Sequence, residues 1–222
     1  MGKLRLYAIA VDEVRDMFGA PADLAARFRD QGHLALQPAS QAHPGEHQGL
    51  LSRLGPIFRR VPGTPVLDPG DPTPDDLERI LAGAYVPAER NVATWRVLEA
   101  LIKENSWGAT GLVLSAEELD SFDFGLARGG VNSAAGLRHL LNTSTELPLR
   151  LPAGLLVGYH SGDQAAWMAQ SYRNALPEVE DRGHRDLAYG LANWLDGLPH
   201  WALVAESLHR PAPDVIGFWS AP

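Results

Sequence analysis

The sequence predicts an α+β fold: a single helix-rich domain with a small sheet. The chain has 222 residues, about the length of one ordinary domain. Its composition of 45% apolar and 21% charged residues is that of a globular protein with a sizeable core. Apolar residues recur mainly at helical spacing, and only a few short runs have the pattern of strands. Because these runs do not alternate regularly with helices, we do not expect a doubly wound parallel sheet.

The individual elements follow from local signals along the chain. Leu4, Leu6 and Ala8 alternate with other residues, which predicts a strand that passes directly into a helix near residue 11. The longest helical pattern is 88–105, whose apolar stripe predicts core residues. Further helices are expected at 22–30, around Leu50 to Leu54, from Thr73 through Leu81, from Ser115 onward, from Leu137 to Leu141, at 163–175 and at 184–197. The remaining strands are expected at 112–114, 154–159 and 215–219, and 201–208 is expected to be a strand or a helix.

Two segments are expected to be irregular. Residues 61–74 hold five prolines and two glycines in fourteen positions, too many for a helix or a central strand. We interpret this stretch as a proline-rich internal linker or loop within one globular domain that spans residues 1–222. Residues 120–133 combine aromatic side chains with three glycines and no fixed period, and we interpret them as an ordered loop.

Charge and composition exclude several classes of protein. The 19 basic and 27 acidic residues give a net charge of −8, so we expect neither nucleic acid nor a membrane as partner. The absence of cysteine excludes disulfides and thiolate metal sites. The apolar stretch near the N-terminus is too short for a signal-peptide core, and no run reaches the ~18 apolar residues of a membrane-spanning helix. We therefore expect a cytoplasmic protein.

The sequence predicts neither a cofactor nor a metal. His43 and His47 are four residues apart, but the proline and glycine between them disfavour a shared helix face. We interpret 37–48, which contains both histidines, as a loop. The acidic group at 178–181 matches no calcium-loop spacing and is interpreted as a solvated turn.

A serine hydrolase is the alternative function. Ser161 lies between an expected strand and an expected helix, where a nucleophile elbow would place a serine. Among the acids and histidines downstream, Asp196 and His200 would complete a triad. However, Tyr159 and Asp163 occupy the two positions where an elbow needs glycine. The competing interpretation is that Ser161 caps the helix that follows it.

The loop expected at 120–133 carries the candidate partner-binding residues. Aromatic residues and arginine are enriched at the energetic centres of protein interfaces. The candidates are Asp120, Phe122, Asp123, Phe124 and Arg128. In the competing interpretation, both phenylalanines pack beneath their own loop.

The two ends of the chain resemble a family. Residues 4–15, Leu-Arg-Leu-Tyr-Ala-Ile-Ala-Val-Asp-Glu-Val-Arg, and residues 213–219, Pro-Asp-Val-Ile-Gly-Phe-Trp, look like the ends of a group of uncharacterised actinobacterial proteins of similar length. Such small acidic proteins resemble immunity factors, which neutralise a cell's own secreted toxins, including the NAD-degrading necrotizing class. The resemblance implies a non-enzymatic protein that binds and occludes a cognate toxin, and it assigns no role to an individual residue. A housekeeping module without a small-molecule site is a third hypothesis.

Overall fold

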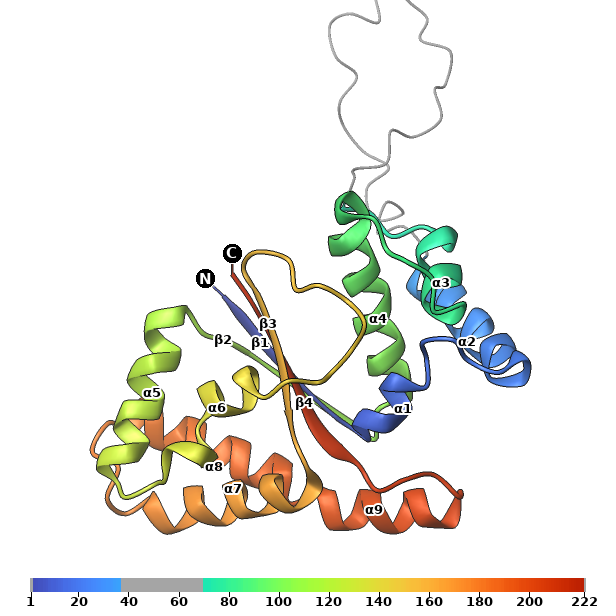
Figure 1. The fold of residues 1–222 in the computed structure, drawn as a ribbon. Helices are drawn as coiled ribbons and strands as arrows, with labels where there is room; N and C mark the ends of the chain where they lie inside the picture. The colour runs from blue at the N-terminus through green and yellow to red at the C-terminus, as the bar shows by residue number, and fades with distance from the viewer. Residues whose placement is uncertain (1, 37–69, 222) are drawn as a thin grey trace, which may run out of the picture.

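The computed structural model describes residues 2–36 and 70–221, which form one α+β domain (Figure 1). In this described part, four strands build one antiparallel sheet in the order β2-β1-β4-β3. The strands are β1 (Lys3–Ile9), β2 (Gly108–Val113), β3 (Leu155–His160) and β4 (Asp214–Ser220). The helices are α1 (Val11–Arg15), α2 (Ala22–Ala35), α3 (Pro74–Leu81), α4 (Asn91–Asn105), α5 (Ala116–Arg128), α6 (Leu137–Asn142), α7 (Gly162–Ala175), α8 (Arg182–Leu195) and α9 (Leu198–Ser207), with short 3-10 turns η4 (Ala88–Arg90) and η5 (Ser133–Ala135). The predicted fold class is confirmed.

The two central strands come from opposite ends of the chain. β1 and β4 are antiparallel neighbours, with Lys3 opposite Ser220 and Ile9 opposite Asp214. Figure 1 shows the two chain ends close together, at the same end of these central strands. Because this pairing joins residues far apart in sequence, the centre of the sheet is a long-range feature of the fold.

Alternation along β1 divides the core into two parts. Leu4, Leu6 and Ala8 point to one face of the sheet and pack with α5 to α9. Tyr7 and Ile9 point to the opposite face and pack with α2, α3 and α4. Figure 1 shows these two groups of helices on opposite sides of the sheet. We call them the α5–α9 side and the α4 side.

The helix predicted within 88–105 is α4, and its apolar stripe packs against the sheet. Trp95, Leu98, Leu101 and Ile102 are buried, as expected for core residues. Val92, which belongs to the same pattern, is 42% exposed. Val92 therefore borders the solvent, although its neighbours Ala93 and Thr94 are buried.

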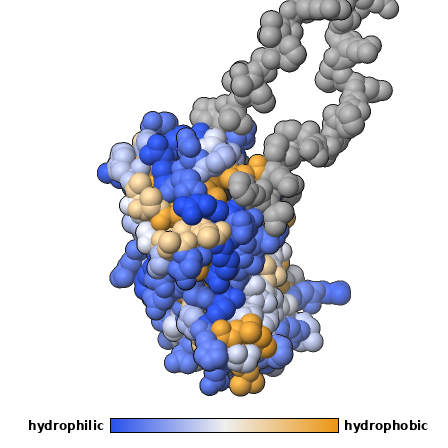
Figure 2. All heavy atoms as spheres, turned by 90° about the vertical axis from the view of Figure 1, so that its right-hand side faces the viewer, coloured by the Kyte–Doolittle hydropathy of each residue, from blue (hydrophilic) through white to orange (hydrophobic). Residues whose placement is uncertain are grey.

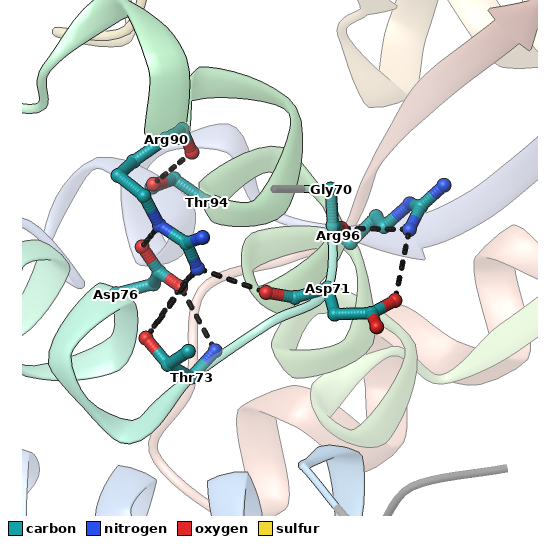
Figure 3. Close-up of polar contacts among 7 residues, drawn as sticks. All are labelled: Gly70, Asp71, Thr73, Asp76, Arg90, Thr94 and Arg96. Carbon is teal, nitrogen blue, oxygen red and sulfur yellow. Dashed lines mark hydrogen bonds and ion pairs between the residues drawn. The ribbon is translucent and has the colours of Figure 1, made fainter. Parts of the chain in front are cut away.

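A buried ion pair joins the start of α3 to the start of α4 (Figure 3). Asp76 is 1% exposed, and Arg90 donates hydrogen bonds to both of its carboxylate oxygens. The backbone N–H and the hydroxyl of Thr73 donate to the same carboxylate, each at 2.8 Å. Burial alone would raise the pKa of Asp76, but the hydrogen bonds from Arg90 and Thr73 hold it below its usual value. Arg96 adds a second link, donating to the carbonyl oxygen of Gly70 at 2.7 Å.

The absence of a side chain at Gly158 allows α6 to lie against β3. A Cβ at this position would lie 2.0 Å from the carbonyl oxygen of Leu140. Glycine is therefore required here by the close approach of two backbones.

The structure corrects several expected boundaries. The helix expected at 22–30 continues to Ala35, and the strand expected at 112–114 begins earlier, as β2. Residues 201–208 are largely helical, within α9. The predicted start of a helix at Thr73 and Pro74 is confirmed, so the expected linker overlaps α3 at Pro74. The part of the expected linker up to residue 69, the loop expected at 37–48 with His43 and His47, and the helix expected around Leu50 to Leu54 lie outside the described residues.

Candidate functional site

The prediction of an ordered loop at 120–133 was wrong, because most of this segment is helical. α5 begins as predicted at Ser115, whose hydroxyl accepts the N–H of Glu118 at 3.1 Å while the Glu118 carboxylate accepts the N–H of Ser115 at 2.7 Å. Gly125, which suggested a loop, lies inside the helix. A Cβ there would lie 2.6 Å from Nδ1 of His184. This glycine therefore serves the close packing of α5 on α8.

The helix separates the candidate contact residues into buried and exposed ones. Phe122 is fully buried. Its ring lies edge-on to the rings of Tyr172 and His184, with centroid distances of 5.9 and 5.8 Å. Phe122 is therefore a core residue, and its expected role in partner contact was wrong.

Asp123 also has a structural role. Its carboxylate accepts the N–H groups of Leu137 at 2.9 Å and Arg138 at 2.8 Å, at the start of α6. Burial raises the pKa of Asp123, and these two hydrogen bonds oppose the rise. Both oxygens of Asp123 thus hold the start of a helix, and its role in partner contact stays a prediction.

The other three candidates lie at the surface. The Asp120 carboxylate is 63% exposed and lies 2.5 Å from Nε of Arg138. Phe124 is 67% exposed, although it lies in the middle of a helix. Arg128 follows it by four residues, so the two side chains share one face of α5. Arg128 Nη2 lies 3.4 Å from a carboxylate oxygen of Glu180.

A hollow of about 310 Å³ lies beside Phe124, between α5 and the start of α8. Its lining residues are Ser121, Phe124, Gly125, Arg128, Glu178, Val179, Glu180, Asp181 and His184. Three of these carry carboxylates and one carries a guanidinium, so the lining is acidic. We call this hollow, together with the exposed ring of Phe124, the Phe124 surface.

Sequence reasoning missed the second half of this surface. Glu178, Glu180 and Asp181 were interpreted only as a solvated acidic turn. Asp181 accepts the N–H of His184 at 2.8 Å and so caps α8, which places the acidic turn opposite α5. The cap was visible in the sequence, but the packing of α8 on α5 was not.

The residues of the alternative hydrolase are not brought together. The Ser161 hydroxyl accepts the N–H of Gln164 at 3.3 Å, and the Gln164 side chain accepts the N–H of Ser161 at 3.0 Å. Asp196 binds Arg173, and His200 is an exposed residue of α9. In the part of the chain that the structure describes, no hydrogen bond joins Ser161, Asp196 and His200. The interpretation of Ser161 as the cap of α7 is confirmed.

The described residues contain no group of three or more acidic, histidine or cysteine side chains placed to hold a metal ion. Across the same ranges, none of the helices combines the length and the apolar character needed to cross a bilayer.

The fold and the Phe124 surface define a helix-rich α+β domain with an aromatic side chain beside an acidic hollow. The chain belongs to a family described as a domain of unknown function, DUF7691, whose model matches residues 1–220. A comparison with curated proteins and a comparison with solved structures found no match.

Proposed function

We propose that the chain is a non-enzymatic binding protein of the immunity or antitoxin type, which binds a cognate toxin and occludes its active cleft. The exposure of Phe124 beside an acidic hollow carries the proposal. An exposed ring of this kind removes a large apolar area from water when a partner covers it. The resemblance of this small acidic chain, in size and charge, to immunity factors supports the class. The proposed place of action is the cytoplasm, where a producing cell would meet its own toxin.

Charge supports a basic partner. The chain carries a net charge of −8, and Glu178, Glu180 and Asp181 surround the hollow beside Phe124. Complementary charge speeds association and disfavours wrong partners. A toxin that degrades NAD must attract a substrate with two phosphates, so its cleft is expected to be basic. Such a cleft would meet both features of the Phe124 surface.

The test compares two single substitutions in the full chain. Phe124→Ala removes the exposed ring, and Leu203→Ala removes a side chain on α9 that is also 67% exposed. We expect both variants to fold, because surface substitutions usually change stability by less than about 0.5 kcal/mol. Purification from native lysate identifies the retained protein, and calorimetry then measures the affinity of the purified pair. We expect Phe124→Ala to weaken binding by about 30-fold or more, and Leu203→Ala to leave it unchanged.

Two results would contradict the proposal at different levels. Equal affinity of the Phe124→Ala variant and the wild type would place the contact elsewhere on the chain. The inhibitory role is measured separately, as the enzymatic activity of the partner with and without this protein. A partner that binds through Phe124 and keeps its full activity would leave the binding surface in place and refute the immunity function.

A further inference from the structure

A second, larger cleft lies on the α4 side, across the sheet from α5. It encloses about 790 Å³ between α4, the sheet and the segment before β3. Small-molecule sites in proteins usually enclose about 300 to 1,000 Å³. The exterior of this side of the molecule is mainly hydrophilic, with apolar residues in small separate groups (Figure 2). The cleft is therefore a concave site within a polar surface.

Two periodic patterns build this cleft. On β1, the residues Lys3, Arg5 and Tyr7 alternate with core residues and share the face that points toward α4. On α4, lining residues recur every three or four positions and so form one stripe along the helix. This stripe consists of Val92, Arg96, Glu99 and Lys103. The sheet thus provides the floor of the cleft and α4 provides one wall.

Among the described residues that line the cleft, Glu99 is the only carboxylate, and it is already bound. Arg5 donates to both of its oxygens, with 3.2 Å between Nη2 and Oε2, and the Tyr7 hydroxyl donates to Oε1 at 2.9 Å. Burial and the neighbouring Glu99 raise the pKa of Tyr7, so its hydroxyl keeps the proton that it donates. Because Glu99 is held by Arg5 and Tyr7, it does not neutralise the other cations of the cleft.

Both lysines of the chain lie in this cleft. The sequence has only Lys3 and Lys103, and both line the cleft with Arg5 and Arg96. Within the described residues, neither lysine has a carboxylate within ion-pair distance. Four cations and one carboxylate make the cleft strongly basic in a chain whose net charge is −8. Such a concentration of one charge sign attracts small ions of the opposite sign.

The two arginines of the cleft have protein partners. Arg5 binds Glu99, while Arg96 donates to the carbonyl oxygen of Gly70 and lies 3.9 Å from a carboxylate oxygen of Asp71. The cations left for a ligand are therefore the ammonium groups of the lysines. A carboxylate ligand is typically bound by the planar fork of an arginine, whereas lysine binds phosphate as a point charge.

An apolar surface lies beside the basic one. Trp95 and Phe218 line the cleft with their rings edge to face, at a centroid distance of 6.0 Å. Val92, 42% exposed, lies one turn before Arg96 on the same stripe. Because Trp95 and Phe218 are only 4% and 1% exposed, an organic group would lie against Val92 and the half-buried Leu155 while its charged end reaches the lysines.

We propose that this cleft binds a small organic phosphate, with the phosphate on the lysines of the cleft, Lys3 and Lys103, and the organic part along Val92 and Leu155. The phosphate group offers three oxygens and a charge near −2, so it can accept hydrogen bonds from several N–H donors. This site is separate from the Phe124 surface, and neither proposal depends on the other.

The experiment titrates the full chain with ADP and, in parallel, with inorganic pyrophosphate, measured by calorimetry. Lys3→Gln/Lys103→Gln removes both exposed ammonium groups. Its control, Arg27→Gln/Arg182→Gln, removes two positive charges from exposed helix positions outside the cleft. We expect the lysine variant to weaken ADP binding by about tenfold or more and the control to change it by less than about twofold.

A third variant tests the organic part of the site. Val92→Glu places a carboxylate at a half-exposed lining position, and we expect it to weaken ADP binding at least as much as the double lysine variant does. ADP is expected to bind more tightly than pyrophosphate. The proposal is overturned by no binding of ADP at millimolar concentration, by equal weakening in the arginine control, or by equal affinity for pyrophosphate and ADP.

Discussion

The two sides of the sheet differ in how completely their buried polar groups are paired. On the α4 side, Asp76, Glu99 and Tyr7 are hydrogen-bonded to charged or polar partners. On the α5–α9 side lie all the described buried side-chain nitrogen and oxygen atoms without a hydrogen-bond partner: Nδ1 and Nε2 of His160, the hydroxyl of Tyr172 and Nε1 of Trp107. One side is therefore held together partly by ion pairs, and the other by apolar packing that tolerates unpaired polar atoms.

This difference predicts different sensitivities. Removing one member of a buried ion pair leaves the other charge uncompensated, which is costly. An unpaired buried polar atom already carries its desolvation penalty, so replacing it by an apolar group of similar shape costs little. On the α4 side, the loss of a charged residue should therefore lower the free energy of unfolding most. On the α5–α9 side, the free energy of unfolding should fall under conditions that add a charge to a buried group.

The largest effect is expected from Arg90→Ala on the α4 side. Asp76 is 1% exposed and would keep its buried charge without its main partner. We expect the free energy of unfolding, measured by urea denaturation, to fall by about 3 to 5 kcal/mol. Arg29→Ala, which breaks the exposed pair with Glu78, is the control and should have little effect. Equal losses of unfolding free energy in the two variants would contradict the prediction that the burial of Asp76 makes its ion pair more important than the exposed one.

The next effect concerns pH on the α5–α9 side. His160 is fully buried, and burial lowers its pKa from 6.5 to about 4, with a smaller contribution from His139. The folded chain keeps the ring neutral, whereas the unfolded chain takes up a proton below pH 6.5. The free energy of unfolding should therefore fall as the pH drops from 6.5 toward 4, by about 2 kcal/mol at pH 5. Above pH 6.5, His160 contributes no pH dependence.

His160→Leu is the matched variant for this effect. It should remove the loss between pH 6.5 and 5 and should retain stability at pH 7, where the wild-type ring is neutral and unpaired. Burial raises the pKa of Asp123 and Asp214, so their protonation at lower pH stabilises the folded chain. This contribution is the same in the wild type and in the His160→Leu variant. Denaturation curves of the two proteins at pH 7, 6 and 5 provide the measurement. If the unfolding free energies of the two proteins fall equally between pH 7 and 5, His160 is not the cause of the pH dependence.

The smallest effect is expected where the two sides are alike, at the helix starts. Ser161 caps α7 on one side as Thr73 caps α3 on the other, each through a capping box. Ser161→Ala should lower the free energy of unfolding by about 1 kcal/mol, and Ser161→Asp should retain most of it, because aspartate also caps well. Labelling of Ser161 by a fluorophosphonate probe would contradict its assignment as a cap alone and would favour the hydrolase.

Features that depend on nearby residues were predicted well. The caps at Thr73, Ser115 and Ser161 and the strands at both chain ends follow from a few neighbouring side chains, and the structure contains them. The loop expected at 120–133 failed because glycine was interpreted as a turn signal. Gly125 instead has a packing role against His184, a residue far along the chain.

The candidate sites could be predicted only in part. Phe124 and Arg128 were selected from residue type alone, and the structure places both at the surface, but their role in partner contact stays a prediction. The carboxylates beside them, and the two lysines of the basic cleft, belong to elements that are distant in sequence. No local pattern shows that Lys3 and Lys103 line one cleft.

Periodicity and capping act over a few residues, so the fold class, the order of most elements and the starts of several helices could be predicted from the sequence. The burial of Phe122 and the exposure of Phe124, two positions later, depend instead on how α5 packs against the rest of the domain. The ion pair of Asp76 and the basic cleft likewise depend on the tertiary structure. Burial and charge pairing depend on which element, distant in sequence, packs against each face of a helix or strand. The residues of that helix or strand alone do not determine its packing partner.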